Sequence, residues 1–179
     1  MSVFTNSASR SRDEATAYTA AILGLLAEQK PLAVLKQTKS KLRRAVARLS
    51  ARRLRKREAP GKWSIAHVVQ HLVDSEIVWS WRMRLILAQD RPPLTGYDQD
   101  LWADRLGYET TDAARAITEF GVLRDANLRL LTRAKPEDLA RVGVHSERGE
   151  ESIAHLMKLY AGHDILHLNQ IARIRKTIS

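Results

Sequence analysis

The sequence contains no cysteine among its 179 residues. This absence excludes disulfide bonds, thiolate metal ligands and a cysteine nucleophile. The chain also has no apolar run long enough to span a bilayer, and its opening stretch, MSVFTNSASRSRDEA, lacks the apolar segment of a secretory signal. From these absences we expect a cytoplasmic protein that does not cross a membrane.

Signals for β-strands are almost absent as well, and the sequence shows no internal repeat. Residues 1–11 are rich in serine and have no periodic pattern, so we expect a disordered N-terminal segment there. The remaining residues, 12–179, are numerous enough to bury a substantial core. We therefore expect them to form a single domain.

What the sequence does contain is apolar residues at helical spacing, in five segments. These segments cover residues 13–29, 31–49, 65–88, 112–134 and 153–176. Ser64 and Ser152 stand where N-cap residues are expected. Four long amphipathic segments after a further N-terminal one predict an all-α fold, a four-helix bundle with an additional N-terminal helix. The apolar face of that first helix needs cover, which either a homodimer or the protein's own bundle would provide.

Two connections are longer than a simple turn. Residues 89–110 form an extended loop, and loops of this length in compact domains are often functional. Residues 142–151, VGVHSERGEE, are mostly polar and predict a connector or a short hairpin. We expect His145, inside this stretch, to be an exposed residue.

The net charge of +10 comes from one part of the chain. Residues 30–57 contain twelve Lys or Arg and no acid, whereas the other residues carry 18 basic and 20 acidic groups. A solvated helix face followed by a basic connector explains this excess, and a patch that binds a polyanion is the alternative. No aromatic residue interleaves these basic residues and no nucleic-acid motif is present, so polyanion binding ranks last among the functions considered.

Five of the six histidines fall in two of the predicted helices. His67 and His71 lie in one of them, and His155, His163 and His167 in the other. Residues four apart on a helix project from one face, so two imidazoles can converge on one ion, and a third from a facing helix would complete a metal site. Half-buried core histidines bonded to backbone carbonyls are the alternative. Apolar flanks at VVQHLV and ILHL place the rings on core-facing stripes, where an unpartnered imidazole is costly.

Three motifs in this order resemble one known family. The stretch GKWSIAHVVQHLVDSE, the loop GYDQDLWADRL and the stretch GHDILHLNQIARIR are similar to the DinB superfamily, and more closely to its YfiT-like branch. The resemblance covers residues 31–174. It implies a four-helix bundle that holds a metal ion through three histidines. The matching positions here are His71, His163 and His167, which become the predicted metal ligands and, through the metal, the predicted catalytic residues.

The other two helical histidines fit the metal site less well. His67 shares a helix face with His71, but the family pattern does not require histidine at that position, so we interpret it as a supporting or surface residue. His155 lies two turns before His163 and is rotated off its face.

Arg82 is the first candidate for contact with a substrate. It shares the helix face of His71 and Ser75, which places its guanidinium near the mouth of a cavity, where it could hold a substrate carboxylate bidentately. The resemblance also supports an arginine at this point of the helix. A salt bridge to Asp98 or Asp100 in the long loop is the alternative.

Two tyrosines are the other substrate-binding candidates. Tyr97, together with Trp102, comes from the long loop and could form a lid over the site, although burial in the core is a competing explanation. Tyr160 lies one turn before the first histidine ligand of the last helix and is also explained as a core residue. Gln170 lies one turn beyond the second of these ligands, within reach of the site.

The predicted chemistry follows from the ligand set. Three neutral imidazoles leave a divalent ion its full positive charge, which lowers the pKa of a bound water or thiol and polarises a carbonyl group. Zinc and nickel both accept imidazole, and the sequence does not choose between them. The resemblance adds that related proteins include S-transferases that use bacillithiol or mycothiol, a thiol-dependent isomerase, and proteins described only as metal-dependent hydrolases.

We therefore predict an enzyme that acts on a small-molecule substrate. It is either a metal-dependent hydrolase or a thiol S-transferase with a low-molecular-weight thiol as cosubstrate. A non-catalytic bundle that binds or senses a metal or another ligand is the alternative function.

Overall fold

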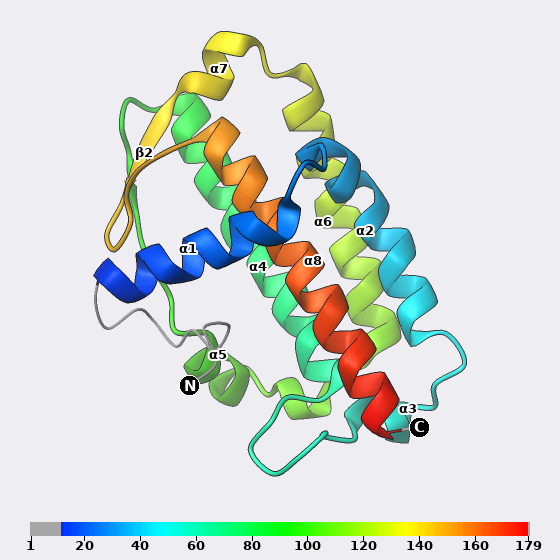
Figure 1. The fold of residues 1–179 in the computed structure, drawn as a ribbon. Coiled ribbons are helices and arrows are strands. Elements are labelled where there is room, and N and C mark those ends of the chain that lie inside the picture. Colours follow the sequence, from blue (N-terminus) through cyan, green and yellow to red (C-terminus); the bar gives the residue numbers. More distant parts are fainter. Residues whose placement is uncertain (1–11, 179) are drawn as a thin grey trace.

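The structure is a computed structural model, and four long helices dominate its fold (Figure 1). The structure describes residues 12–178, so the disorder expected for residues 1–11 lies outside the described part. The helices are α1 (Arg12–Leu26), α2 (Pro31–Val46), α3 (Ala51–Arg55), α4 (Ile65–Ala88), α5 (Gln99–Arg105), α6 (Ala113–Arg133), α7 (Pro136–Ala140) and α8 (Ile153–Ile178), with a 3₁₀ helix η1 (Tyr108–Thr110). The strands are β1 (Pro93–Leu94), β2 (Val142–His145) and β3 (Gly149–Ser152).

Polar caps fix where the long helices begin. Ser64 and Ser152 accept hydrogen bonds from the backbone N–H groups three residues later, at 3.3 and 3.1 Å. Asp112 accepts in the same way at the start of α6, and Pro31 occupies the first turn of α2, where its missing N–H costs nothing. The predicted bounds of α4 therefore agree with the structure, and those of α6 and α8 agree to within two residues.

The four long helices pack in a closed ring. α2 contacts α8, α8 contacts α4, α4 contacts α6, and α6 contacts α2 again. Two clusters of buried apolar residues fill the interior of this ring and extend under α1. The prediction of an all-α four-helix bundle is confirmed.

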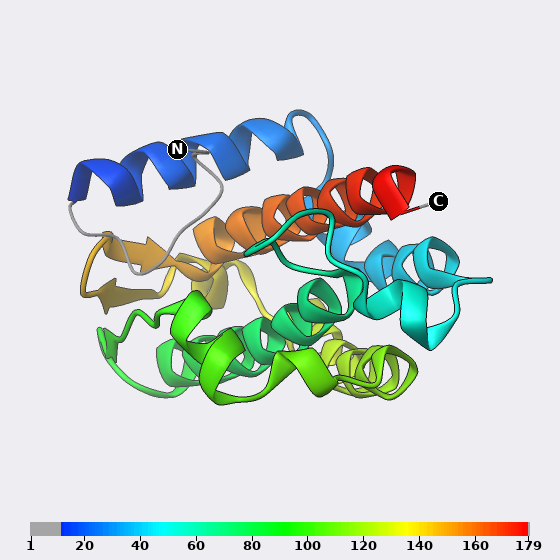
Figure 2. The ribbon, with the colours of Figure 1, turned by 90° about the horizontal axis from the view of Figure 1, so that it is seen from below.

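α1 crosses the bundle on the outer side of α8 (Figures 1 and 2). Ile22 and Leu26 are buried in this contact, so the protein's own bundle covers the apolar face of the first helix. The contact is close because α8 has a glycine at position 162. A Cβ atom there would lie 2.3 Å from the backbone oxygen of Ile22. This close approach fixes α1 against the helix turn that carries His163.

The segments between the long helices build one end of the molecule. β2 and β3 form the antiparallel hairpin that residues 142–151 predicted, with Val142 opposite Ser152. β1 adds to the hairpin as a parallel strand, which the sequence did not predict because the strand is only two residues long. Residues 89–110 are therefore not an open loop, since they contribute β1, α5 and η1.

One prediction about this hairpin is wrong. His145 is 2% exposed rather than solvent-accessible. Alternate residues of a strand face opposite sides, and in β2 the residues that face inward are Gly143 and His145. His145 is therefore held under the sheet against the bundle.

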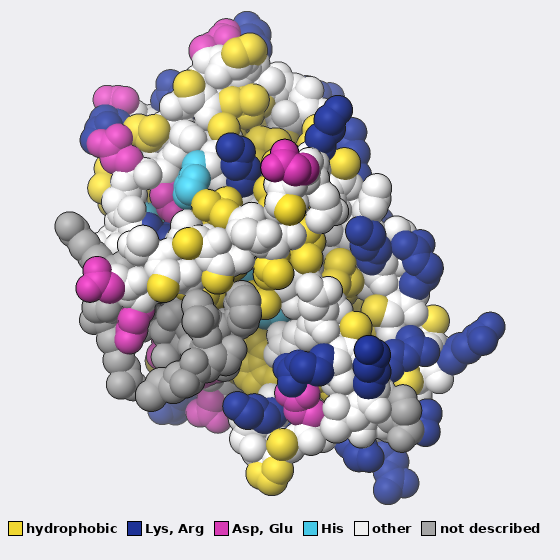
Figure 3. Space-filling view, viewed as in Figure 1, with side chains coloured by type: hydrophobic (Ala, Val, Ile, Leu, Met, Phe, Trp, Pro, Cys, Tyr) yellow, Lys and Arg dark blue, Asp and Glu magenta, His cyan; other side chains and the backbone are white. Residues whose placement is uncertain are grey.

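The surface reflects the uneven charge of the sequence. Lys and Arg side chains gather along the side of the molecule formed by α2 and α3 (Figure 3). Among the described helices, none combines the length and the hydropathy needed to cross a membrane.

Candidate metal centre

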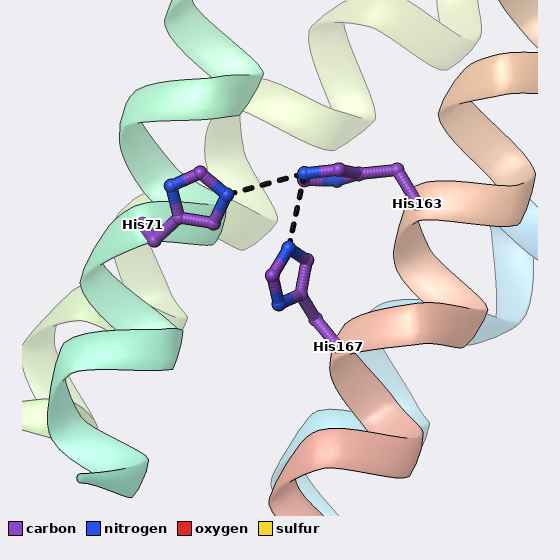
Figure 4. Close-up of side chains that lie close together, drawn as sticks. All are labelled: His71, His163 and His167. Atoms are coloured by element: carbon purple, nitrogen blue, oxygen red, sulfur yellow. Dashed lines mark hydrogen bonds between the residues drawn. The ribbon is translucent and has the colours of Figure 1, made fainter. Parts of the chain in front are cut away.

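Three histidines from two helices meet in the bundle core (Figure 4). His71 projects from α4, and His163 and His167 project from α8, which packs against α4. All three side chains are buried, at 1%, 6% and 5% exposure. The three residues predicted as ligands from the sequence are thus brought together by the fold.

The ring nitrogens of the three histidines face one another. The Nε2 atom of His163 lies 3.1 Å from Nε2 of His71 and 3.1 Å from Nε2 of His167. A neutral imidazole nitrogen carries either one hydrogen or one lone pair, but not both. The three rings therefore cannot satisfy all three nitrogens by bonding only to one another, and the Ser75 hydroxyl, 3.3 Å from Nε2 of His71, is the one further protein group in reach among the described residues.

Burial keeps these imidazoles neutral. It lowers the pKa of His71 and His163 well below the usual value, and the neighbouring His167 lowers both further. Burial also lowers the pKa of His167 to about 4, although Gln170 and Asp164 act in the opposite direction. Neutral imidazole is the protonation state that binds a metal, so no proton has to be displaced from these rings at neutral pH.

Gln170 fixes the tautomer of one ring. Its Oε1 atom accepts a hydrogen bond from Nδ1 of His167 at 2.8 Å. Nδ1 therefore carries the hydrogen, and the lone pair of Nε2 points into the cluster. The Nδ1 atoms of His71 and His163 are buried and have no hydrogen-bond partner in the described part of the chain.

Two of the nitrogen–nitrogen separations fit a divalent ion, and all three candidate nitrogens lie within 4.8 Å of one another. At a metal–nitrogen bond of about 2.0–2.1 Å, two ligand nitrogens lie about 2.9 Å apart for a 90° ligand angle and about 3.4 Å apart for a tetrahedral angle. The two 3.1 Å separations fall between these values. Three imidazoles would leave coordination positions open for water or substrate, as catalytic sites require.

A cavity of about 90 Å³ opens beside the cluster and has His71 and His163 in its wall. Ser75 lies at the junction, because its Oγ atom is 3.3 Å from Nε2 of His71 and 3.0 Å from the hydroxyl of Tyr97. The ring of Tyr97 packs on Trp102, with the two ring centroids 4.5 Å apart. The two aromatic residues proposed as a lid thus lie together, and Tyr97 lines the cavity.

The other predicted substrate contacts divide into two groups. Arg82 lines the same cavity, and its guanidinium donates to the carbonyl oxygen of Thr95 rather than to Asp98 or Asp100. Tyr160 does not line the cavity. Its ring stacks on Trp79 in the core, with the ring centroids 4.9 Å apart.

The remaining helical histidines stand outside the cluster. His67 is buried but turns away from it, because Nδ1 lies 2.8 Å from the Ser64 hydroxyl and Nε2 lies 3.2 Å from the Arg57 guanidinium. His155 is half-buried and belongs to neither the cluster nor the cavity wall. Both fit the supporting or peripheral roles expected from the sequence.

Sequence reasoning missed a buried ion-pair cluster next to the histidines. Arg124 of α6, 1% exposed, binds Glu76 of α4 and Asp164 of α8 at 2.9 and 2.7 Å. Asn127 also donates to Glu76, and Thr38 donates to Asp164. The available signal was the presence of charged residues at positions of the apolar helix stripes.

Comparisons with known proteins agree with this architecture. The family model of the DinB superfamily matches residues 35–171. A relative from Bacillus mycoides (strain KBAB4) is 28% identical over 144 residues, which cover 78% of this chain and 80% of that protein. One from Bacillus cereus (strain G9842) is 29% identical over 142 residues, covering 77% and 79%. Both are provisionally named metal-dependent hydrolases.

A solved structure shares the fold. YfiT from Bacillus subtilis, described as a probable metal-dependent hydrolase with an unusual four-helix bundle topology, superposes with a TM-score of 0.73. The alignment covers 82% of this chain and 86% of YfiT at 23% sequence identity. With the family model matching most of the chain, the chain belongs to the DinB superfamily, and it shares the bundle fold of YfiT.

Proposed function

We propose that this protein is a metal-dependent hydrolase in which His71, His163 and His167 hold one divalent ion. The observation that carries the proposal is the convergence of three buried, neutral Nε2 atoms that cannot satisfy one another. The provisional names of the Bacillus relatives point to the same activity. Zinc and nickel, which both accept imidazole ligands, are the ions we propose.

A divalent ion in this site would lower the pKa of water, or of a thiol, toward neutrality. The protein's own residues supply the surroundings. Ser75 and Tyr97 place two hydroxyl groups at the junction between the histidines and the cavity, where they can donate to or accept from a bound substrate. Arg82, in the same cavity wall, supplies a positive charge for substrate binding.

The buried ion-pair cluster supports the site without contacting the substrate. Asp164 directly follows His163 on α8 and is held by Arg124 of α6. This bond fixes the rotation of α8 about its axis, and with it the direction in which the His163 ring projects. Tyr160 is left out of the proposed substrate contacts, because its ring lies between Trp79 and Arg124 in the core.

A thiol S-transferase is the second reaction that this site would serve, with a low-molecular-weight thiol in place of water. A bundle that binds a metal or another ligand without turnover is the third function to test. We also propose that the described residues form one domain, since a single ring of helices contains both core clusters.

The experiment compares turnover by protein stripped of metal and then reloaded with zinc or nickel. Ester and amide substrates test hydrolysis, and an electrophile with cysteine, bacillithiol or mycothiol as donor tests transfer. We expect product formation that requires the metal and disappears in His163→Ala but not in the matched control His155→Ala on the same helix. Metal binding without any product would favour the sensing function. Failure to bind metal would contradict the whole proposal.

A further inference from the structure

A second set of polar groups lines the same cavity and takes no part in the histidine cluster. His145 reaches it from β2 and is 2% exposed. Its Nδ1 atom accepts a hydrogen bond from the backbone N–H of Glu147 at 3.1 Å. In the neutral ring the hydrogen is therefore on Nε2. That buried Nε2–H has no acceptor among the residues that the structure describes.

Arg82 faces the same space with most of its donors unused. It is 5% exposed, and within residues 12–178 its one hydrogen bond goes to the carbonyl oxygen of Thr95. A guanidinium has five N–H donors, and the described chain gives this one no carboxylate partner. Burial, and secondarily Arg148, lower the pKa of Arg82 to about 10, so the group remains a cation at neutral pH.

The nearby Arg148 cannot take the same role. Its guanidinium is bound in a bidentate pair to Glu151, at 2.6 and 2.8 Å. The charges of Arg148 and Glu151 therefore cancel locally, and among the described residues of the cavity wall Arg82 is the cation with no acid within ion-pair distance. Tyr18 adds a further hydroxyl from α1, and burial raises its pKa, so it stays protonated and can donate.

We propose that Arg82 and His145 form an anion subsite that binds a carboxylate group of the substrate. A buried cation without an anionic partner and a buried N–H without an acceptor are costly unless a ligand supplies both. A carboxylate fits, because its two oxygens accept charge-assisted hydrogen bonds from a guanidinium and from an imidazole N–H at the same time. The identification of this ligand as the substrate rests on the proposed function, whereas the binding of a carboxylate at Arg82 and His145 does not.

The negative charge of Glu147 restricts the charge of the ligand, and favours a monoanion. It is the one described acid in the cavity wall, and it lies beside Gly96, where a Cβ atom would come within 2.5 Å of its Oε1 atom. Glu147 repels every negative charge on a ligand, and Arg82 is the one cation of the described wall without an ion-pair partner to attract it, so a second negative charge adds repulsion without a matching cation. The subsite therefore favours a monocarboxylate over a dicarboxylate or a phosphate dianion.

The first test uses the unmodified protein. Histidine side chains are labelled with ¹⁵N, and the Nε2–H resonance of His145 is followed while propionate is added to protein stripped of metal by EDTA. We expect a saturable shift of that resonance with propionate. Propionamide, which has the same shape and no charge, should cause little or none. Equal responses to the two probes would overturn the proposal.

Single-residue variants test whether propionate binds at Arg82 and His145. Arg82→Gln and His145→Phe should each weaken propionate binding by about tenfold or more, the usual effect of losing a hydrogen bond to a charged group. Glu147→Gln should strengthen it by a few fold, and the exposed control Arg129→Gln should leave it unchanged. Circular dichroism checks that each variant is folded. Folded Arg82→Gln and His145→Phe proteins that bind propionate as well as the parent would contradict the subsite.

The same titration in zinc-reloaded protein separates this proposal from the metal-dependent function. Propionate binding that persists without metal supports the subsite even if the protein proves unable to bind an ion. Binding that appears only with zinc and ignores the Arg82 and His145 variants would mean that the acid binds at the three histidines, and it would refute the subsite.

Discussion

Two buried polar clusters lie side by side in the bundle and differ in one respect. In the first, Arg124 donates to Glu76, to Asp164 and to the backbone oxygen of Leu35. Its charged groups are paired, and no buried atom of the three side chains lacks a partner within the described chain. In the second, the three imidazole rings cannot satisfy one another, and the Nδ1 atoms of His71 and His163 have no partner in the described chain.

The difference separates a structural cluster from a binding site. Asp164 and His163 are neighbours in the sequence and are both buried, so neither burial nor position distinguishes them. What distinguishes the two residues is whether the hydrogen-bonding groups of their cluster all have partners within the protein. A network that is complete within the protein fixes helix positions, whereas one that remains incomplete requires a further atom. This difference supports the proposal that the histidines form the binding site and that the ion pairs hold the helices around it.

The largest effect is expected from a variant that disrupts the fully paired cluster of Arg124, Glu76 and Asp164. Arg124→Met should lower the free energy of unfolding by about 3–5 kcal/mol, because it leaves Glu76 and Asp164 buried without a cation. Chemical denaturation measures the change. The exposed Arg129 of the same helix provides the control, since Arg129→Met should alter stability by less than about 0.5 kcal/mol. A loss below about 1 kcal/mol for Arg124→Met would show that this cluster is not the structural support described.

The next largest effect is a loss of metal affinity, and it is expected from a change in the histidine cluster. His163→Ala should weaken divalent-metal binding by more than the roughly 10- to 100-fold typical of changes to groups that only support a ligand, because it removes one of the three proposed ligands. Competition with a chromogenic chelator measures the affinity. The stability of the metal-free protein should change far less than in Arg124→Met, because the three rings do not satisfy one another without an ion. Unchanged metal affinity would place the ion elsewhere.

A smaller effect tests the group that orients one ligand. Gln170→Leu removes the acceptor for Nδ1–H of His167 and should weaken metal binding about 10- to 100-fold. The same chelator competition applies. Asn169→Leu, at the exposed neighbouring position, should have no effect on affinity. If both variants bind metal equally well, Gln170 does not fix the tautomer of His167.

The smallest effect comes from an ion pair of the same chemistry as the buried cluster but at the surface. Lys39 of α2 and Asp125 of α6 lie 2.8 Å apart, with side chains 30% and 50% exposed. Lys39→Ala should cost about 0–1 kcal/mol, because water screens the pair. Comparison with Arg124→Met isolates burial as the cause of the larger loss. Similar losses in both variants would contradict that explanation.

Much of the fold was predictable because it depends on local patterns. The helical spacing of apolar residues and the caps at Ser64 and Ser152 defined α4 and α8 closely. The convergence of His71, His163 and His167 was predictable from their spacing and their motifs. Their meeting needs only that two amphipathic helices pack with their apolar stripes facing.

The rest depends on contacts between distant segments. The parallel pairing of β1 with β2 joins residues about fifty positions apart and leaves no periodic signal in a two-residue strand. That pairing places the hairpin against the bundle, which is why His145 was wrongly expected to be exposed. The partners of Arg124 were likewise unpredictable, since they lie 48 and 40 residues away on other helices.

The central claim is that the three histidines bind one divalent ion. Elemental analysis of the purified protein after zinc or nickel loading and dialysis, combined with X-ray absorption spectroscopy at the metal edge, tests it most directly. We predict one ion per chain with three imidazole nitrogens at about 2.0–2.1 Å. A protein that retains no stoichiometric ion, or an ion whose spectrum is unchanged in His71→Ala, His163→Ala and His167→Ala, would contradict the claim.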